Sequence, residues 1–400
     1  MSAALLAPAS EEEVARAVAA AVAAGEPLAI EGNGSKRALL RPVQAARTLS
    51  TRNLTGITLY SPEELVLSAR AGTPLPEIEA ALAEKGQHLI AEPPDTRALF
   101  DTDAPATLGG VVAANLSGPR RIAWGAMRDH VLGVRFVNGA GEVIRSGGRV
   151  LKNVTGLDLG KLLAGSYGTL GVLTEITLKV LPAPESTGSL ALRVPDLAAG
   201  VRALSAGLGS PFGPTGAALL PQGAPALGLE GVTALLRIED FAESVAYRLG
   251  RLRDLLAPAL GTPTLLDAGT SRTLWRMVRE ASLLGATAAE AIWRISVPPT
   301  AGLVVAAALR EEFGARLLLD WGGGLVWVAG PATEAAHAAV VAAARAGGGT
   351  WTLFRAPEPL RAAVDVLPPE PPPLAAIAAR VKAALDPKGV LNPGRMRAGF

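Results

Sequence analysis

Apolar residues recur at helical spacing near the start of the chain. Ser10 precedes three glutamates and then valines at every fourth position from Val14 to Val22, and Gly25 stands where such a helix would end. A serine before an acidic first turn caps a helix, and glycine is common just past the last turn. The pattern predicts a helix between Ser10 and Gly25, with a strand over Pro27–Ile30.

The pattern continues with strands and helices in alternation up to about residue 182. A strand at Leu65–Ala69 precedes Thr73, which we expect to cap a helix that ends near Gly86. The turn Asn138–Gly141 is typical of a hairpin and separates two further apolar runs, Val131–Val137 and Val143–Arg145. This part of the chain is α+β or α/β.

The character of the sequence changes after Pro184. Leucine-rich and alanine-rich helical patterns alternate with short strands, which predicts an antiparallel sheet backed by helices. We expect the strands at Leu190–Val194, Ala217–Leu220, Thr233–Ile238, Ala291–Val297, Arg316–Asp320, Leu325–Val328 and Thr350–Phe354.

A proline-rich stretch, Leu367–Pro373, is too stiff for a helix or a central strand and predicts an extended spacer before a last helix at Leu374–Leu385. The expected division is therefore a first domain over residues 1–183, a second over 184–366 and a C-terminal segment over 367–400.

Composition supports a folded protein and removes several kinds of function. Of the 400 residues, 49% are hydrophobic and 18% are charged, as in an ordinary folded protein. A chain of this length is expected to form two domains. The net charge of +2 and scattered basic residues argue against nucleic-acid binding. Because cysteine is absent, disulfides, iron-sulfur ligation and a cysteinyl-flavin bond are excluded, so any cluster must lie on a partner. The three histidines lie too far apart in sequence to predict a metal site.

The first residues and the apolar runs bear on location. The start of the chain has no basic stretch before a long apolar run, as a signal peptide would, and no segment of about 18 apolar residues predicts a membrane span. The sequence predicts a cytoplasmic protein, held at the inner face of the membrane, if at all, through partners.

Three glycine-rich segments carry the candidate chemistry. The loop EGNGSK, residues 31–36, follows a strand directly; residues 103–125 are dense in glycine, alanine and serine; and a third cluster lies within residues 162–182. Such loops let backbone N–H groups approach phosphate closely, although each alone is also common in ordinary turns.

The three segments, together with the tail DPKGVLNPGR, resemble the FAD-linked oxidases of the vanillyl-alcohol-oxidase superfamily, in the same order along the chain. Within that family, GPRR, RDHVLG, KNVTGLDL and GSYGTLGVLTE resemble the FAD-binding E-type subunits of bacterial glycolate oxidase. The resemblance implies a PCMH-type FAD-binding domain with two subdomains, followed by an antiparallel, ferredoxin-like cap domain, an α+β architecture.

The resemblance also implies which residues hold FAD. The first loop would bind its diphosphate, and the other segments would line the rest of the cofactor. Because Ser35 stands where covalent flavoproteins of this family often carry a histidine, we expect non-covalent FAD. The expected cofactor residues are Gly32, Asn33, Gly34, Ser35, Lys36, Thr107, Gly109, Gly110, Asn115, Gly168, Gly171, Val172 and Asn392.

A 2-hydroxy acid needs a cation for its carboxylate and a base for its hydroxyl proton. The candidates on the substrate side are Arg294, Trp321, Arg355 and Arg395, although both strand arginines could equally lie on the surface. No histidine is placed as the base, and we expect His337 on a solvent-facing helix.

Two functions stay open on this sequence. One is an FAD-dependent subunit that oxidises a small 2-hydroxy acid beside a catalytic D-type flavoprotein subunit and an iron-sulfur subunit. The other is a non-catalytic structural or electron-relay subunit of the same complex. An NAD-dependent Rossmann enzyme is disfavoured, because EGNGSK lacks the third glycine of GxGxxG.

Overall fold

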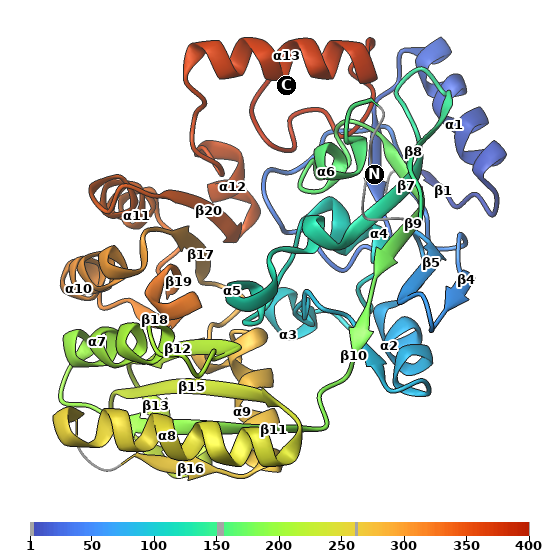
Figure 1. The fold of residues 1–400 in the computed structure, drawn as a ribbon. Helices are drawn as coiled ribbons and strands as arrows, with labels where there is room; N and C mark the ends of the chain where they lie inside the picture. The colour runs from blue at the N-terminus through green and yellow to red at the C-terminus, as the bar shows by residue number, and fades with distance from the viewer. Residues whose placement is uncertain (1–3, 150–155, 261–262, 400) are drawn as a thin grey trace. The chain divides into compact units, whose positions relative to one another are not determined.

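A computed structural model describes residues 4–149, 156–260 and 263–399 of the chain (Figure 1). The chain divides into two compact units. The first unit comprises Met1–Ser117, Ala126–Ala183 and Pro369–Phe400, and the second comprises Gly118–Gly125 and Pro184–Pro368. The short segment Gly118–Gly125 thus belongs to the second unit, although it lies within the range expected for the first domain.

The first unit contains a small parallel sheet and a larger antiparallel sheet. The parallel sheet has the order β1-β3-β2 and the antiparallel sheet β4-β5-β9-β7-β8, while β6 pairs with β10. The strands are β1 Ala4–Leu6, β2 Leu28–Glu31, β3 Arg47–Ser50, β4 Ile57–Ser61, β5 Val66–Arg70, β6 Gln87–His88, β7 Val131–Val137, β8 Val143–Gly147, β9 Val172–Lys179 and β10 Leu181–Pro182. The helices are α1 Glu11–Ala24, α2 Leu75–Ala83, α3 Arg97–Phe100, α4 Leu108–Ala113, α6 Leu159–Leu163 and α13 Pro372–Leu385, with a 3-10 turn at Met127–His130.

The local signals at the start of the chain are confirmed in part. Ser10 accepts a hydrogen bond from the Glu13 N–H at the start of α1, and Gly25 ends that helix in the left-handed conformation. The expected cap at Thr73 is wrong. Its hydroxyl instead hydrogen-bonds the backbone of Gly56, and α2 begins two residues later behind Pro74.

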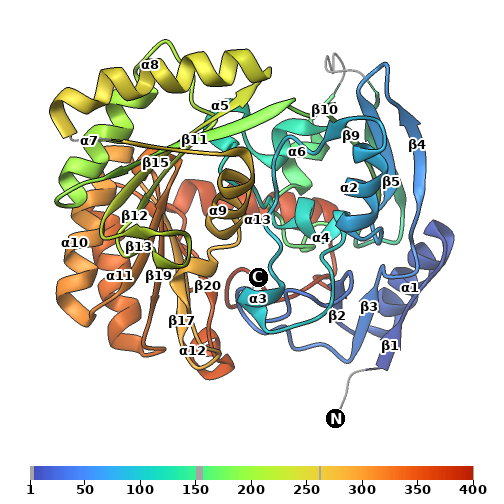
Figure 2. The ribbon, with the colours of Figure 1, turned by 90° about the horizontal axis from the view of Figure 1, so that it is seen from below.

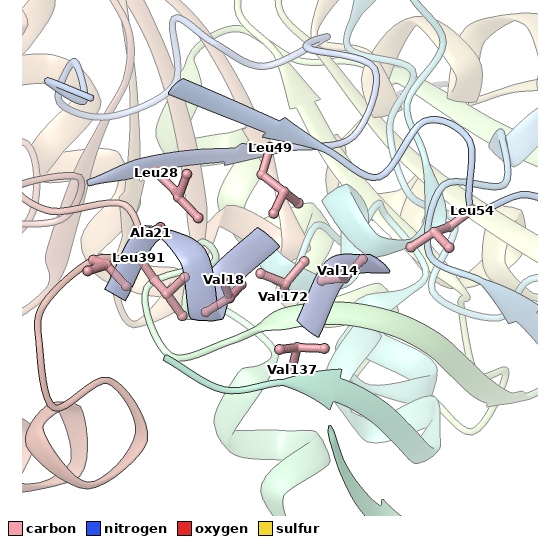
Figure 3. Close-up of a cluster of buried hydrophobic side chains, with 10 residues drawn as sticks. Val14, Val18, Ala21, Leu28, Leu49, Leu54, Val137, Val172 and Leu391 are labelled. Atoms are coloured by element: carbon pink, nitrogen blue, oxygen red, sulfur yellow. The ribbon is translucent and has the colours of Figure 1, made fainter. Parts of the chain in front are cut away.

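One hydrophobic core holds the parallel sheet, α1 and the end of the chain together (Figure 3). Burying such side chains provides most of the free energy that orders the backbone around them. Its members come from α1, β2, β3, the loop after β3, β7, β9 and the C-terminal segment: Val14, Val18, Ala21, Leu28, Leu49, Leu54, Val137, Val172, Val390 and Leu391. The last residues of the chain are therefore part of this core.

The second unit is built on an eight-stranded antiparallel sheet with the order β16-β11-β15-β12-β18-β19-β17-β20. Its strands are β11 Ser186–Arg193, β12 Gly216–Leu220, β15 Thr233–Asp240, β16 Thr264–Leu266, β17 Ala291–Ser296, β18 Arg316–Asp320, β19 Leu325–Gly330 and β20 Thr350–Arg355, with a short pair β13 Gly223–Ala224 and β14 Leu229–Glu230. The helices are α5 Arg121–Trp124, α7 Leu197–Leu208, α8 Ala242–Leu260, α9 Ala268–Arg279, α10 Gly302–Phe313, α11 Glu334–Ala346 and α12 Glu358–Ala363.

The order of these strands contains the same motif twice. Strands β11, β12, β15 and β16 with α7 and α8 form one βαββαβ arrangement, and β17 to β20 with α10 and α11 form another. Each half has the ferredoxin-like strand order, and the halves join at β12 and β18, where Leu219 pairs with Leu319. The α+β expectation with a ferredoxin-like second domain is confirmed.

Helices α7, α8, α10 and α11 cover one face of this sheet (Figure 2). Trp293 of β17 points to that side, where its Nε1 donates a hydrogen bond to Nδ1 of His337, 3.2 Å away. Burial lowers the pKa of His337, whose side chain is only 6% exposed. The expectation that His337 faces solvent is wrong, because α11 turns this one polar residue toward the sheet.

The opposite face of the sheet carries a buried ion-pair network. Glu239 lies between Arg120, 2.6 Å away, and Arg237, 3.3 Å away, and it also accepts a hydrogen bond from Thr215 at 2.7 Å. Burial alone would raise the pKa of Glu239, but Arg237, Arg120 and Thr215 together hold it at about 2. Arg237 also stacks on Trp275 at 4.7 Å. The network ties α5 to β15.

No helix among the described residues is long and apolar enough to cross a membrane.

We expect Glu239→Gln to destabilise the second unit by about 3 to 5 kcal/mol, because two buried guanidinium groups lose their counter-charge. The folded-state pKa of Glu239 is depressed, so its contribution to stability is present above pH 4.5 and is lost as pH falls toward 2. Urea unfolding at pH 7 and pH 3 measures both effects. Glu243→Gln, on the exposed surface of α8, is the control, and equal stability of the two variants would contradict the network.

Candidate cofactor site

The loop that follows β2 has its backbone donors free. Strands β2 and β3 run parallel and end together at Glu31 and Ser50, the edge of a parallel sheet at which ligands commonly bind. In the described part of the chain, no backbone N–H from Gly32 to Lys36 donates a hydrogen bond. Successive unpaired N–H groups in a turn form an anion-binding concavity.

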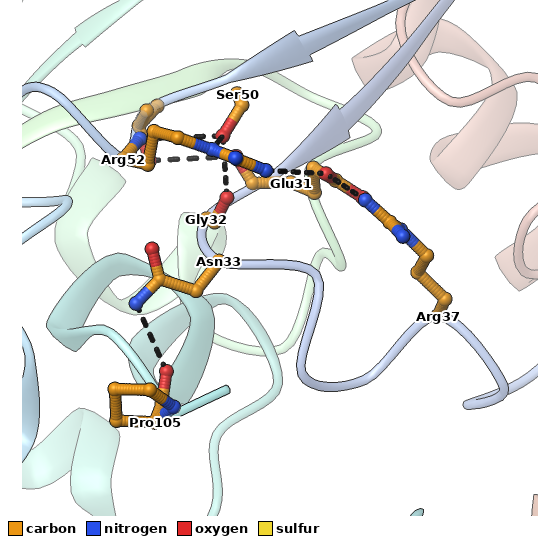
Figure 4. Close-up of polar contacts among 8 residues, drawn as sticks. Glu31, Gly32, Asn33, Arg37, Ser50, Arg52 and Pro105 are labelled. Atoms are coloured by element: carbon orange, nitrogen blue, oxygen red, sulfur yellow. Dashed lines mark hydrogen bonds and ion pairs between the residues drawn. The ribbon is translucent and has the colours of Figure 1, made fainter. Parts of the chain in front are cut away.

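Side chains hold this loop in place from outside (Figure 4). Ser50 donates a 2.5 Å hydrogen bond to the Gly32 carbonyl, and the Asn33 amide donates to the Pro105 carbonyl at 3.1 Å. The Glu31 carboxylate accepts two hydrogen bonds from Arg37, at 2.6 and 2.7 Å. These contacts use carbonyls and side chains, and leave the N–H groups of the loop unoccupied.

Lys36 brings a positive charge to the same place. Its Nζ lies 3.2 Å from the Ser35 hydroxyl, and a Cβ atom on Gly110 would lie 3.4 Å from this Nζ and 3.3 Å from the Thr107 hydroxyl. Burial lowers the pKa of Lys36 to about 8, opposed by the charge of Asp95. A desolvated ammonium beside open N–H groups fits a phosphate ligand.

Helix α4 begins beside this loop. Thr107 caps α4 by accepting a hydrogen bond from the Gly110 N–H at 3.3 Å. The N–H of Gly109 is already bonded to the Ala71 carbonyl, and a Cβ there would lie 2.8 Å from that of Ala71. Gly109 is therefore needed for close packing of α4, whereas Gly110 faces the loop.

The second glycine loop, Gly165–Gly171, is anchored from two sides. The N–H groups of Gly165 and Tyr167 donate to carbonyls at the end of α4. The Asn392 amide accepts a hydrogen bond from the Ile30 N–H and donates one to the Tyr167 carbonyl, both at 2.8 Å. Gly168 lies against Asn392, where a Cβ would approach the amide nitrogen to 2.9 Å. Asn392 thus joins β2 to this loop.

These loops enclose one hollow. Residues from both loops and from α4 line it, and six of them are expected cofactor residues: Gly32, Gly109, Gly110, Gly168, Gly171 and Val172. The Val172 side chain points into the hydrophobic core, so only its backbone faces the hollow. Gly171 cannot carry a side chain, because a Cβ would lie 2.5 Å from the Phe136 ring.

The remaining expected cofactor residues have other places. Gly34 has a φ of +73°, which favours glycine in the first loop. The Ser35 side chain is buried. Asn115 accepts a hydrogen bond from the Arg128 N–H at 3.0 Å, so its side chain supports the chain on either side of Gly118–Gly125.

Two of the four substrate-side candidates are engaged by backbone. Arg395 donates hydrogen bonds to the carbonyls of Lys36, Arg37 and Arg41 at 3.0 to 3.2 Å. Its guanidinium therefore holds the turn that follows the first glycine loop. Arg355 donates to the carbonyls of Thr287 and Glu290. These contacts favour structural roles for both guanidinium groups.

The other two candidates lie together in the second unit. The Arg294 guanidinium lies 4.8 Å from the Trp327 ring centre, 5.6 Å from Phe354 and 5.7 Å from Trp321. The structure adds Arg121 of α5, whose guanidinium lies 4.4 Å from the Trp321 ring. The two arginines of GPRR were not among the expected substrate-side residues. Nothing in the sequence pattern indicates that α5, which contains Arg121, belongs to the second unit.

Trp321 is held in an unusual backbone conformation. Its φ is +54°, its N–H donates to the Asp320 carboxylate at 2.7 Å, and its indole N–H donates to the Gly118 carbonyl at 3.1 Å. A bulky residue with positive φ persists only where its surroundings fix it. The indole that both arginines approach is therefore fixed in place.

Among the described residues, no group of three or more histidine, aspartate or glutamate side chains could hold a metal ion. The first unit instead has what a dinucleotide diphosphate needs: open N–H groups, a buried ammonium and glycines where a Cβ would collide. The fold and this hollow define a dinucleotide-binding type of domain followed by a ferredoxin-like second domain.

Comparisons with known proteins agree. Residues 2–147 match the FAD binding domain family. The chain is 37% identical to glycolate oxidase subunit GlcE of Escherichia coli K12 over 93% of each chain, and 28% identical to glycolate oxidase subunit GlcD of Bacillus subtilis 168 over 60% of this chain and 48% of that one. An alkyldihydroxyacetonephosphate synthase structure superimposes with a TM-score of 0.71 at 18% identity, covering 97% of this chain and 76% of that one. The chain belongs to the FAD-linked oxidase family, and its cofactor is FAD.

We expect Gly32→Ala to abolish FAD retention, because the new methyl group would lie 2.2 Å from the Thr107 hydroxyl and force the first loop away from α4. The bound-flavin absorbance of the purified protein measures the loss. Gly250→Ala, inside α8 with open space around it, should keep full flavin content. Wild-type flavin content in Gly32→Ala would remove the first loop from the site.

We expect FAD affinity to fall as pH rises above 8, by at most about tenfold per pH unit. The free Lys36 ammonium loses its proton near pH 8, whereas a bound diphosphate raises its pKa, so binding takes up a proton above that pH. Equilibrium dialysis between pH 7 and 9.5 measures this slope. Lys36→Met should bind FAD more weakly at pH 7 and show no such slope, and Lys85→Met should resemble wild type. A pH-independent affinity in the wild type would contradict the role of Lys36.

Proposed function

We propose that this chain is the FAD-binding subunit of a glycolate-oxidase-type complex that oxidises a small 2-hydroxy acid. The observation that carries the proposal is the 37% identity to glycolate oxidase subunit GlcE, which extends over 93% of each chain and so includes both units. The reaction removes a hydride from the carbon that bears the hydroxyl group, and FAD supplies the acceptor when bound.

In this proposal the first unit holds FAD without a covalent bond. The N–H groups of Gly32 to Ser35 and the ammonium of Lys36 bind the diphosphate, while Gly110 and Gly168 allow the cofactor to approach the backbone. Ser35 offers a hydroxyl group where a histidine would form a covalent bond, and the chain has no cysteine. The cofactor should therefore dissociate when the protein is denatured.

Arg294 is the proposed partner of the substrate carboxylate. A guanidinium group binds a carboxylate through two parallel hydrogen bonds. Three aromatic rings lie 4.8 to 5.7 Å from the Arg294 guanidinium, which is within the range of cation–π contacts. Arg121 lies on the Trp321 ring and adds positive charge to the same surface. This face would select a small anion over a neutral alcohol.

A second candidate, an electron-relay or structural subunit, is favoured by one specific observation. His337 is the only histidine in the described part of the second unit, and it accepts a hydrogen bond from Trp293 on the helix-covered face of the sheet. Arg294 is the next residue of the same strand, and consecutive residues of a strand point to opposite faces. No histidine of that unit therefore lies on the Arg294 face to take the hydroxyl proton. In that case the base would come from a D-type flavoprotein partner.

The absence of cysteine also bears on the electron acceptor. This chain offers no thiolate for an iron-sulfur cluster, so onward transfer to such a cluster requires a partner subunit. The iron-sulfur subunit that the resemblance to E-type glycolate oxidase subunits implies would supply those ligands in the proposed complex.

The visible spectrum of the purified chain, before and after acid precipitation, tests the proposal. A yellow supernatant would support non-covalent FAD, and bleaching by glycolate or D-lactate without oxygen would support oxidation by this chain alone. Bleaching only after addition of the partner subunits would support the relay function. Protein that stays colourless after incubation with FAD would contradict both.

We expect Arg294→Met to slow bleaching by glycolate at least 100-fold, or about 3 kcal/mol, because the carboxylate loses a charged, bidentate partner. The assay uses whichever preparation bleaches in the wild type, alone or with partners. Arg251→Met, on the exposed side of α8, should behave as wild type. Unchanged bleaching in Arg294→Met would move the anion site elsewhere.

A further inference from the structure

A buried lysine near the end of the chain is bonded to the second glycine loop. Lys382, in the last turn of α13, is 8% exposed. Its ammonium donates to the Asp386 carboxylate at 2.6 Å, to the Thr169 carbonyl at 2.7 Å and to the Leu391 carbonyl at 3.1 Å. All three of its hydrogens are thus used.

Asp386 completes the arrangement. Its carboxylate, 2% exposed, also accepts hydrogen bonds from the N–H groups of Val390 and Leu391, at 3.1 and 2.9 Å. Gly139 packs directly against Asp386, where a Cβ would lie 2.2 Å from the carboxylate, and the Gly139 N–H donates to the Leu385 carbonyl. The pair is enclosed on all these sides, and it fixes the turn that leads to Asn392.

The residues bonded to this ion pair are in turn connected to both glycine loops. Thr169 belongs to the second loop, and its hydroxyl closes that turn by donating to the Ser166 carbonyl at 2.7 Å. Leu391 pairs with Leu28 of β2, which delivers the chain to the first loop. Asn392 then bonds to Ile30 on one side and Tyr167 on the other.

We propose that Lys382 and Asp386, through Asn392, position the two glycine loops that form the cofactor hollow. We name these three residues the C-terminal clasp. Lys382 and Asp386 do not line the hollow and touch no proposed cofactor position, so they are positioning residues. The proposal rests on the proposed role of the glycine loops in binding FAD.

The clasp has a physical reason to be an ion pair. The Thr169 and Leu391 carbonyls and the Val390 and Leu391 N–H groups are buried polar groups, and each would be costly without a partner. One ammonium and one carboxylate satisfy all four at a single point. A neutral side chain at position 382 would release the second loop while leaving the rest of α13 intact.

The test compares Lys382→Met with Arg380→Met, an exposed cation two residues earlier on the same helix. We expect Lys382→Met to raise the Kd for FAD at least tenfold. In the flavin-free protein we also expect faster amide hydrogen exchange in residues 28–36 and 164–173, with residues 184–260 unchanged. Arg380→Met should match wild type in both measurements.

Should Lys382→Met fail to fold, the double variant Lys382→Met with Asp386→Asn replaces it, since this change removes both charges of the pair and leaves neither buried without its partner. Wild-type affinity with wild-type exchange would overturn the proposal, and so would weaker affinity without faster exchange in the two loops. The exchange measurement needs no flavin. A protein that binds no FAD would therefore refute the proposed function while the clasp itself is still tested.

Discussion

The pairing of the C-terminal segment with β2 is the constraint on which the first unit depends. The Leu28 N–H donates to the Val390 carbonyl and the Asn392 N–H donates to the Leu28 carbonyl, so residues more than 360 positions apart form one backbone ladder. Leu28 and Leu391 also lie in the same buried core. These contacts beside the glycine loops form only after the chain has passed through the whole second unit.

This long-range closure explains which features the sequence could predict. Helix α1, the hairpin at Asn138–Gly141 and the strands of the second unit follow from periodicity and turn residues, which are local. The loop EGNGSK is also recognisable locally, because it follows a strand and contains the glycines and the cation that phosphate binding needs. Resemblance to a family supplied the rest of the hollow.

The features that the sequence could not predict are those set by tertiary contacts. Thr73 has the chemistry of a helix cap, yet its hydroxyl bonds to Gly56, a neighbour only in the folded chain. His337 lies in an alanine-rich helix that gives no clue to its buried side. Arg395 and Arg355 have the charge that an anion site needs, but neighbouring carbonyls engage them. The sequence shows that a residue is charged and where it lies along a strand. It does not show whether that charge contacts a ligand or neighbouring backbone.

The segment Gly118–Gly125 shows how the two units are connected within a few residues. The chain leaves the first unit after Ser117, whose hydroxyl accepts a hydrogen bond from the Met127 N–H at 2.9 Å where the chain returns. Between these points, Arg120 is paired with Glu239 and Arg121 lies on Trp321. The hollow-lining helix α4 ends only a few residues earlier. Helix α4 of the proposed cofactor cradle and Arg121 of the proposed anion-binding face are therefore only a few residues apart along the chain, although they belong to different units.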